Sequence, residues 1–275
     1  MEVSAFLRHL LIVMAVVVYG TAHADATLER IKSRNSVVVG VILSGAPFGY
    51  IDANTQQSAG LNIDLAKSIA EKLKVKLELV PVTPPNRVQF LQQGKVDLLI
   101  ANMQLNAERA EILGYVPTPY GEAGGGLITR KGSGVHKWED LKNKVVCVSQ
   151  GSNYAKPLAE QYGANVKGLP GQPESLLALK GGSCFASVHD SAPLHLLIAD
   201  NPEWKDYELP VENDLIPLPS VIWVRKGEAD TASAVDKIVQ DWYRSGWLVD
   251  VYKKNRVPVT PEFAKWQARF AVASK

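Results

Sequence analysis

The sequence is poor in the residues that hold metals. It has two cysteines and five histidines in 275 residues. Cys147 and Cys184 lie far apart, and His136, His189 and His195 are scattered, so none of them has the spacing of a metal-ligand motif. The sequence also has no phosphate-binding loop and no G-x-S-x-G nucleophile elbow. These absences give no support to a metal, a cofactor or a nucleophilic catalytic residue.

No charge of one sign dominates, and long apolar runs are confined to the N-terminus. The 30 basic and 28 acidic residues are interspersed and leave a net charge of +2. A nucleic-acid partner is therefore not expected, because it would require a basic face. No later segment is apolar enough to span a bilayer, so we expect a mature protein that is not inserted in a membrane.

The N-terminus has the pattern of a secretory signal. Arg8 precedes a short apolar run over 10–19, and Ala22-His23-Ala24 forms a small-x-small cleavage site. The run is about half the length of a bilayer-spanning helix, which needs about 20 apolar residues. We expect residues 1–24 to be a signal peptide and the mature protein to be periplasmic. The alternative is an uncleaved anchor. No cysteine follows the run, so a lipoprotein attachment site is absent.

The two cysteines both lie in the expected mature chain. An even number of cysteines in an exported protein suggests a disulfide. Cys147 lies in the strand-like segment KVVCVSQ and Cys184 begins the segment CFASVHD, so a bridge is possible if these strands are neighbours. A cysteine nucleophile is the functional alternative, and export disfavours it.

The first half of the mature chain alternates between strands and helices. Strands are predicted over 36–43, 75–82 and 96–103, and helices over 61–74 and 84–94. The first of these helices repeats leucine or isoleucine at 61, 65, 69 and 73, which places them on one face. This β-α-β-α-β order is typical of a parallel sheet with helices on its faces.

The same alternation returns further along the chain. Strands are predicted over 124–132, 144–150, 164–169 and 184–190, and helices over 152–163, 173–182 and 191–202. The sequence therefore predicts two α/β lobes.

Two junctions rich in proline and glycine separate these lobes. They lie at 116–126 and 213–221, and three amphipathic helices follow the second one. Two junctions indicate that the chain leaves the first lobe (25–119), builds the second (120–216) and returns to the first (217–275). Two crossovers allow hinged closure around a ligand. Ordinary loops are the alternative, because such runs are common in loops.

Polar side chains follow the apolar strand 96–103. Asn102, Gln104 and Arg109 come where this strand ends and the next helix begins, and Asn106 is a suitable N-cap for that helix. Ligands of open parallel sheets lie beyond the carboxyl ends of the strands. A strand end, a helix N-terminus and an arginine together predict a carboxylate site. At the end of the strand 184–190, Asp190 could hold an ammonium group.

Seven segments, in this order, resemble one known family. They are APFGYID, AGLNIDLAKSIAEKL, PVTPPNRVQFLQQGKVDLLIANMQLNAERAE, PY, DLKNKVVCVSQGSN, LLALKGGSCFASVHD and WVRKG. The chain resembles the periplasmic binding proteins of polar amino-acid ABC importers, extracellular solute-binding protein family 3. The resemblance implies a periplasmic binding protein type II-like fold, with two α/β lobes joined by a two-strand hinge. It also implies a monomer without cofactor or catalysis that captures an amino acid and delivers it to the transmembrane subunits of an ABC permease.

The resemblance assigns roles in the first lobe. Arg109 matches the arginine that forks onto the α-carboxylate of the bound amino acid. Asn102 and Gln104 match small polar positions that reach the carboxylate and the amine of the ligand. From the residues alone, Arg109 could equally be a surface arginine on a helix.

The second lobe supplies the other expected contacts. Ser152 and Asn153 match a pair at a helix N-terminus that contacts the carboxylate, and Asp190 matches the acid that takes the α-ammonium. Each has a simpler interpretation: Asp190 and Asn153 could be helix caps, and Ser152 could be a turn residue.

The sequence departs from the family where side chains of the ligand are usually recognised. Gly45 and Pro84 stand at positions that normally carry aromatic residues, and Ile42 stands where acidic or polar groups are common. The first-lobe pocket should therefore be roomier and less charged, which suggests a neutral or bulky amino acid or a derivative. Phe48 or Tyr50 could supply the missing aromatic face, or both could simply pack the lobe.

Two other functions use this architecture. Periplasmic cyclohexadienyl dehydratases resemble these binders but need a positioned general acid. His189 and Glu174 are the candidates for that role. Adjacent strand residues point to opposite faces, so His189 is expected to face away from Asp190. Sensory ligand-binding domains continue into a transmembrane helix, and none is expected after the amphipathic segments near Lys275, so a sensory domain is not the expected function.

Overall fold

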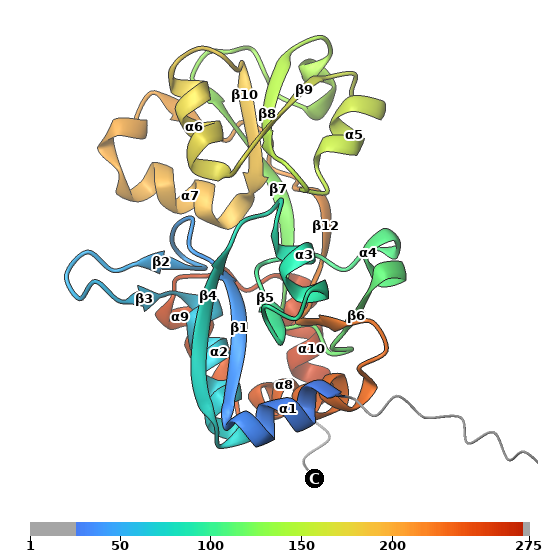
Figure 1. Cartoon of the computed structure of the whole chain (residues 1–275). Coiled ribbons are helices and arrows are strands. Elements are labelled where there is room, and N and C mark those ends of the chain that lie inside the picture. The colour runs from blue at the N-terminus through green and yellow to red at the C-terminus, as the bar shows by residue number, and fades with distance from the viewer. Residues whose placement is uncertain (1–25, 272–275) are drawn as a thin grey trace, which may run out of the picture.

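The computed structural model describes residues 26–271, which form two α/β lobes, one above the other in Figure 1. The expected signal peptide, residues 1–24, lies outside the described residues. The helices are α1 (Ala26–Arg34), α2 (Leu61–Leu73), α3 (Arg87–Gln92), α4 (Ala107–Ile112), α5 (Ala155–Glu160), α6 (Gln172–Lys180), α7 (Ser191–Asp200), α8 (Ala229–Arg244), α9 (Trp247–Lys254) and α10 (Pro261–Ala271), with 3-10 turns at Trp138–Leu141 and Pro202–Trp204.

Most strands are short. They are β1 (Ser36–Ile42), β2 (Tyr50–Ile51), β3 (Ser58–Ala59), β4 (Lys76–Val82), β5 (Leu98–Ile100), β6 (Leu113–Tyr115), β7 (Gly121–Arg130), β8 (Val145–Ser149), β9 (Asn165–Leu169), β10 (Ala186–Asp190), β11 (Tyr207–Glu208), β12 (Leu215–Ser220) and β13 (Trp223–Arg225). β2 and β3 form a small hairpin within the segment that separates β1 from α2.

The first lobe is built on a sheet with the strand order β4-β1-β5-β13-β6. β1 pairs in parallel with β4 and β5, as the β-α-β-α-β pattern predicted. β13 runs antiparallel to β5 and β6, although more than 100 residues of chain separate β13 from each of them. The chain therefore returns to its first sheet after building the second.

The second lobe is built on a sheet with the order β11-β7-β10-β8-β9. β8 pairs in parallel with β9 and β10, whereas β7 is antiparallel to β10. β7 begins at Gly121, three residues before the predicted strand, because the glycine-rich junction is itself extended and paired. The junction was predicted as a linker, and much of it is strand.

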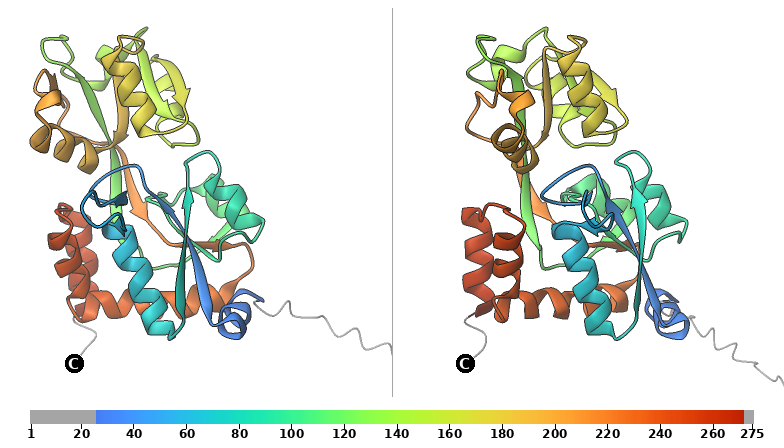
Figure 2. Two further views of the ribbon diagram at one scale, coloured as in Figure 1. Left: turned by 60° about the vertical axis from the view of Figure 1, so that its left-hand side comes forward. Right: turned by 90° about the vertical axis from the view of Figure 1, so that its left-hand side faces the viewer.

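Two antiparallel strands, β7 and β12, run side by side between the lobes (Figure 2). β12 contains Pro217 and Pro219, which lack an N–H group; such residues are tolerated in strands at the edge of a sheet, and among the strands of residues 26–271 β12 pairs with β7. Its register is interrupted between Leu215 and Leu218. Ile216, inside this interruption, has a φ of +39°, a value that β-branched residues rarely adopt.

Each lobe has its own apolar core. In the first lobe, the predicted face of α2 is confirmed, since Leu61, Leu65 and Ile69 are fully buried against β1 and the C-terminal helices α8–α10. These helices, red in Figure 2, cover the first lobe although they follow the second lobe in the sequence. The separate cores leave the boundary between the lobes free for a cleft.

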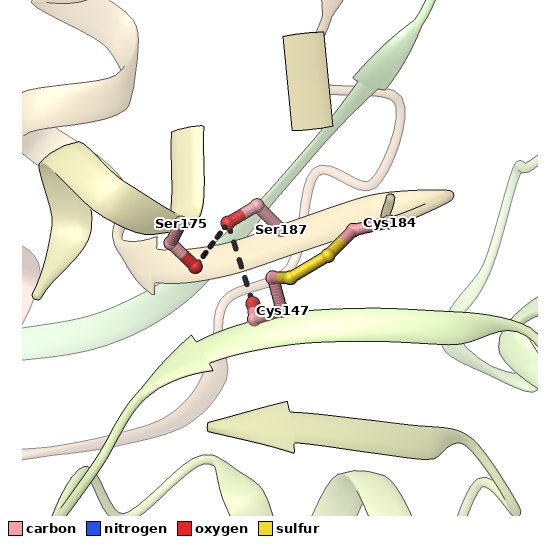
Figure 3. The surroundings of a disulfide bond; sticks show 4 residues. All are labelled: Cys147, Ser175, Cys184 and Ser187. Carbon is pink, nitrogen blue, oxygen red and sulfur yellow. Dashed lines mark hydrogen bonds between the residues drawn. A yellow bond between two sulfur atoms is a disulfide. The ribbon is translucent and has the colours of Figure 1, made fainter. Parts of the chain in front are cut away.

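The predicted bridge between Cys147 and Cys184 is present and lies inside the second lobe (Figure 3). It joins β8 to the residues just before β10, which are neighbouring strands, as the prediction required. Beside the bridge, the Ser187 hydroxyl contacts the Ser175 hydroxyl at 3.1 Å and donates to the Cys147 carbonyl at 3.3 Å. The bridge thus braces the sheet whose strand ends face the first lobe.

Candidate functional site

All seven residues expected at a ligand site line one cleft between the lobes. They are Phe48, Asn102, Gln104, Arg109, Ser152, Asn153 and Asp190. The cleft leaves about 700 Å³ unfilled by atoms, its opening to solvent included.

Arg109 is fixed by the start of α4. The Asn106 side chain accepts a hydrogen bond from the Arg109 backbone N–H at 2.9 Å and so forms the predicted N-cap. Nη1 of Arg109 donates to the Gln104 carbonyl at 2.8 Å, and Nη2 donates to the Gly151 carbonyl of the second lobe at 3.1 Å. α4 has only six residues, so the guanidinium rather than a helix dipole supplies the positive charge.

A second arginine, Arg87, lines the same cleft, and the sequence did not single it out. It is buried, its Nη1 donates to the Ala101 carbonyl at 2.9 Å, and its Nε has no partner in the described part of the chain. Burial lowers the pKa of Arg87 to about 10. Burial, together with the like charge of Arg87, lowers the pKa of Arg109 to about 9. A bound anion would stabilise the charged form of both guanidinium groups.

Arg87 left no clear signal in the sequence. It is the first residue of α3, a helix of only six residues. Only the folded chain shows that this helix start faces the cleft.

Asp190 faces the arginines from the end of β10. It occupies the N-cap position of α7, but its side chain makes no cap hydrogen bond. Its Oδ1 instead accepts a hydrogen bond from the Tyr154 hydroxyl at 2.7 Å. Burial raises the pKa of Asp190, whereas the Tyr154 hydroxyl and the positive charge of Arg87 lower it. The buried carboxylate would therefore be stabilised by a ligand cation.

His189 also lines the cleft, next to Asp190 in the sequence. The ladder of β10 runs through Asp190, and the two side chains have different neighbours, since the Asp190 carboxylate contacts Tyr154 and the imidazole of His189 lies near Ser149. His189 Nδ1 lies 3.4 Å from the Ser149 hydroxyl, and Nε2 has no partner within residues 26–271. Burial lowers the pKa of His189 to about 3, so its imidazole is neutral at neutral pH.

Gln104 is almost completely buried and uses its whole side-chain amide within the protein. Nε2 donates to the carbonyls of Ala123 (2.5 Å) and Ile216 (3.3 Å), and Oε1 accepts from Asn153 Nδ2 at 2.8 Å. This residue was expected to reach the ligand. The structure places it at the base of the cleft, beside β7 and β12. These two strands, which connect the lobes, are called the crossing strands below.

The remaining expected residues lie around this base. Asn102 has a left-handed backbone, with a φ of +48°, and its N–H donates to the Tyr120 hydroxyl at 3.2 Å. The Ser152 hydroxyl is buried and has no partner in the described residues. Asn106 Nδ2 donates to Asn153 Oδ1 at 3.4 Å, which gives Asn153 contacts on both sides of its amide.

Phe48 combines the two roles considered for it. It lines the cleft and also packs against the core of the first lobe, with 9% of its surface exposed. Ile42, Gly45 and Pro84, the positions that depart from the family, line the same cleft. Glu174, the other candidate acid, is exposed on α6 and lies outside the cleft lining.

The two lobes touch across the cleft. Gly151 contacts Arg109, and Asn153 contacts Gln104, as described above. At the edge of the cleft, Nζ of Lys156 on α5 lies 3.5 Å from Oε1 of Glu108 on α4. Two cations and one buried anion therefore face a shared space. A zwitterion matches this arrangement, because its carboxylate meets the arginines and its ammonium meets Asp190.

Within residues 26–271, no group of three or more His, Cys, Asp or Glu residues is placed to hold a metal ion. No helix of this part of the chain is long and apolar enough to cross a membrane.

The fold and the cleft define a two-lobed α/β solute-binding protein of type II. The chain belongs to the bacterial extracellular solute-binding proteins, family 3, whose model matches residues 37–256. A relative, the ABC transporter glutamine-binding protein GlnH of Bacillus subtilis, is 29% identical over 233 residues, which are 83% of this chain and 84% of GlnH.

Solved structures of similar fold bind amino acids. The solute receptor for L-cysteine of Neisseria gonorrhoeae has a TM-score of 0.79 and 28% identity, and the match covers 86% of this chain and 98% of the receptor. An ancestral amino-acid-binding protein, described as a precursor of cyclohexadienyl dehydratase, has a TM-score of 0.74 and 26% identity. The match covers 83% of this chain and 99% of the ancestral protein. The second match bears on the enzyme alternative.

Proposed function

We propose that this protein is the solute-binding component of an amino-acid ABC importer. One observation carries the proposal: Arg109 and Asp190 approach one cleft from opposite lobes. A free amino acid bound between them would join the lobes through its own two charges. A ligand shifts an opening equilibrium only through its different affinities for the two states, and a zwitterion that bridges the lobes has that difference.

The ligand side chain is the next part of the proposal. The first-lobe wall contains Ile42, Gly45 and Pro84 and carries no acid, which favours a neutral or bulky side chain or a derivative. Arg87 Nε and His189 Nε2 have no partners in the described residues, so an acceptor on that side chain, such as an amide oxygen, would satisfy one of them.

The biological setting follows from the same function. A signal peptide over 1–24 would export the chain to the periplasm, and the transmembrane subunits of an ABC permease would receive the ligand there. We place the lobes at 25–119 with 217–275, and at 120–216, and we expect a monomer. The comparisons support the transport setting, since GlnH belongs to an ABC transporter.

A thermal-shift panel on mature protein that has been unfolded, washed and refolded tests the proposal. Refolding removes any ligand carried through purification. The panel contains the twenty amino acids, common derivatives and prephenate. A ligand at a hundred times its Kd adds about 2.7 kcal/mol to the unfolding free energy, and each kcal/mol raises the Tm of such a chain by roughly 2–4 °C.

The outcomes separate the candidate functions. A shift of several degrees with one or a few amino acids, absent in Asp190→Asn, supports the binder and identifies its ligand. A shift with prephenate alone would favour a dehydratase-like enzyme, and turnover of prephenate would then be measured. A panel without any shift would contradict both.

A further inference from the structure

The side chain of Gln104 connects three separate parts of the protein. Its Nε2 donates hydrogen bonds to the Ala123 carbonyl in β7 and to the Ile216 carbonyl in β12. Its Oε1 accepts from Asn153 of the second lobe. Both crossing strands and the second lobe therefore meet at one amide, which itself belongs to the first lobe.

This amide has little capacity left for a ligand. A glutamine has two N–H donors, and the two contacts of Nε2 use both of them. Gln104 is also almost completely buried. To bind the Gln104 amide, a ligand carboxylate would have to displace it from a strand carbonyl, which would cost that carbonyl a hydrogen bond.

Gln104 also lies where the pairing of the crossing strands is irregular. Leu215 pairs with Gly125 and Leu218 with Ala123, so one residue of β7 opposes two residues of β12. Such a bulge leaves backbone groups of the extra residue outside the ladder. The Gln104 amide binds the carbonyl of Ile216, which lies inside the bulge, and that of Ala123, at its edge. One side chain thereby bridges the interrupted ladder.

We propose that Gln104 is a positioning residue, which sets the geometry of the two crossing strands and favours the closed arrangement of the lobes, rather than a residue that reads the ligand. Its bond to Asn153 joins the lobes, and its bonds to β7 and β12 fix the strands about which the lobes rotate. The link to affinity rests on the proposed binding function, whereas the effect on lobe geometry does not.

The test combines two substitutions with two measurements. Gln104→Asn keeps the amide but shortens its reach by one methylene group. Gln104→Glu replaces the NH₂ group with an oxygen that cannot donate to the strand carbonyls when ionised. Gln93, which is exposed just after α3, provides the matched controls Gln93→Asn and Gln93→Glu.

The first measurement is made without ligand. Spin labels at Gln89→Cys on α3 and Glu174→Cys on α6, both exposed and on opposite lobes, report the distance between the lobes by pulsed electron resonance. Both Gln104 variants should shift the distances to longer values, whereas the Gln93 variants should match the parent. Urea unfolding of each variant shows whether it is folded, and Gln104→Asn remains a test if Gln104→Glu does not fold.

The second measurement is calorimetric titration with every amino acid that gave a thermal shift. Both Gln104 variants should weaken all of these ligands by a similar factor, about tenfold for one lost hydrogen bond to a buried carbonyl. Unchanged lobe distances would overturn the proposal, and so would a loss of affinity restricted to one ligand. If no amino acid binds the parent protein, the proposed function fails, and the distances still decide the role of Gln104.

Discussion

Removal of the Arg109 guanidinium should abolish most ligand binding and leave the fold intact. In Arg109→Ala, the ligand carboxylate loses its forked partner while it remains in a largely desolvated cleft. Truncation of one partner of a buried charge pair costs about 2–5 kcal/mol, which is roughly a 30- to 5,000-fold weaker affinity. Arg87 still supplies a positive charge, so we expect a loss of about 3 kcal/mol.

The cost to the fold should be smaller. Arg109 donates to the carbonyls of Gly151 and Gln104, and the loss of these two bonds should lower the unfolding free energy by about 1–3 kcal/mol. Arg109→Lys keeps the charge but loses the fork, so its affinity should fall between those of the parent and Arg109→Ala. Arg244→Ala, an exposed arginine at the end of α8, is the matched control.

Calorimetric titration with the amino acid found in the panel measures the affinity, and urea unfolding measures the stability. The reasoning is refuted if Arg109→Ala binds as tightly as the Arg244→Ala control. It is also refuted if Arg109→Lys binds no better than Arg109→Ala, because the positive charge would then contribute nothing.

Three further predictions concern the second lobe. Because burial raises the pKa of Asp190 above its ordinary value of 3.8, affinity should be full at neutral pH and fall as the pH drops through that raised pKa. Titration between about pH 7 and pH 4 checks this, and His189→Gln should leave the profile unchanged, because the pKa of His189 is already about 3. Tyr154→Phe removes a hydrogen bond to the Asp190 carboxylate. It should therefore move the midpoint of the pH dependence of affinity upward and weaken binding roughly tenfold or more. An unchanged midpoint would contradict the role of this hydroxyl. The Cys147–Cys184 bridge closes a loop of 37 positions, so its reduction should lower the unfolding free energy by about 4 kcal/mol. Ligand affinity should hardly change, since the bridge lies outside the cleft lining. An equal urea midpoint with and without reductant would show that the bridge does not stabilise the lobe.

Several elements could be predicted from the sequence because their causes are local. The α2 helix repeats apolar residues at the helical period, and β1 is rich in β-branched residues, so neighbouring positions alone determine these two elements. The Asn106 cap is likewise a contact between residues three positions apart. Short elements such as β6 and β11 were missed, because two or three residues form a strand only when a distant partner provides the hydrogen bonds.

The candidate site divides in the same way. Arg109 and Asp190 were predicted because they lie near strand ends in segments whose order resembles the family, and their roles stay predictions. Arg87 and Tyr154 were not predicted as site residues. Arg87 lines the cleft and Tyr154 donates to Asp190 only because segments far apart in the sequence meet in the fold. Gln104 is the clearest case: its partners lie 19, 49 and 112 positions away.

The sequence by itself predicted two α/β lobes, two of the charged groups that line the cleft, Arg109 and Asp190, and a bridge between the two cysteines. It did so because strand and helix periods, turn residues and the cysteine count are properties of short segments. Only the tertiary structure decided that the amide of Gln104 bonds to both β7 and β12, that a second arginine lines the cleft, and that His189 lines it too. Burial and hydrogen-bond partners arise when distant segments meet, and no local pattern records which segments those are.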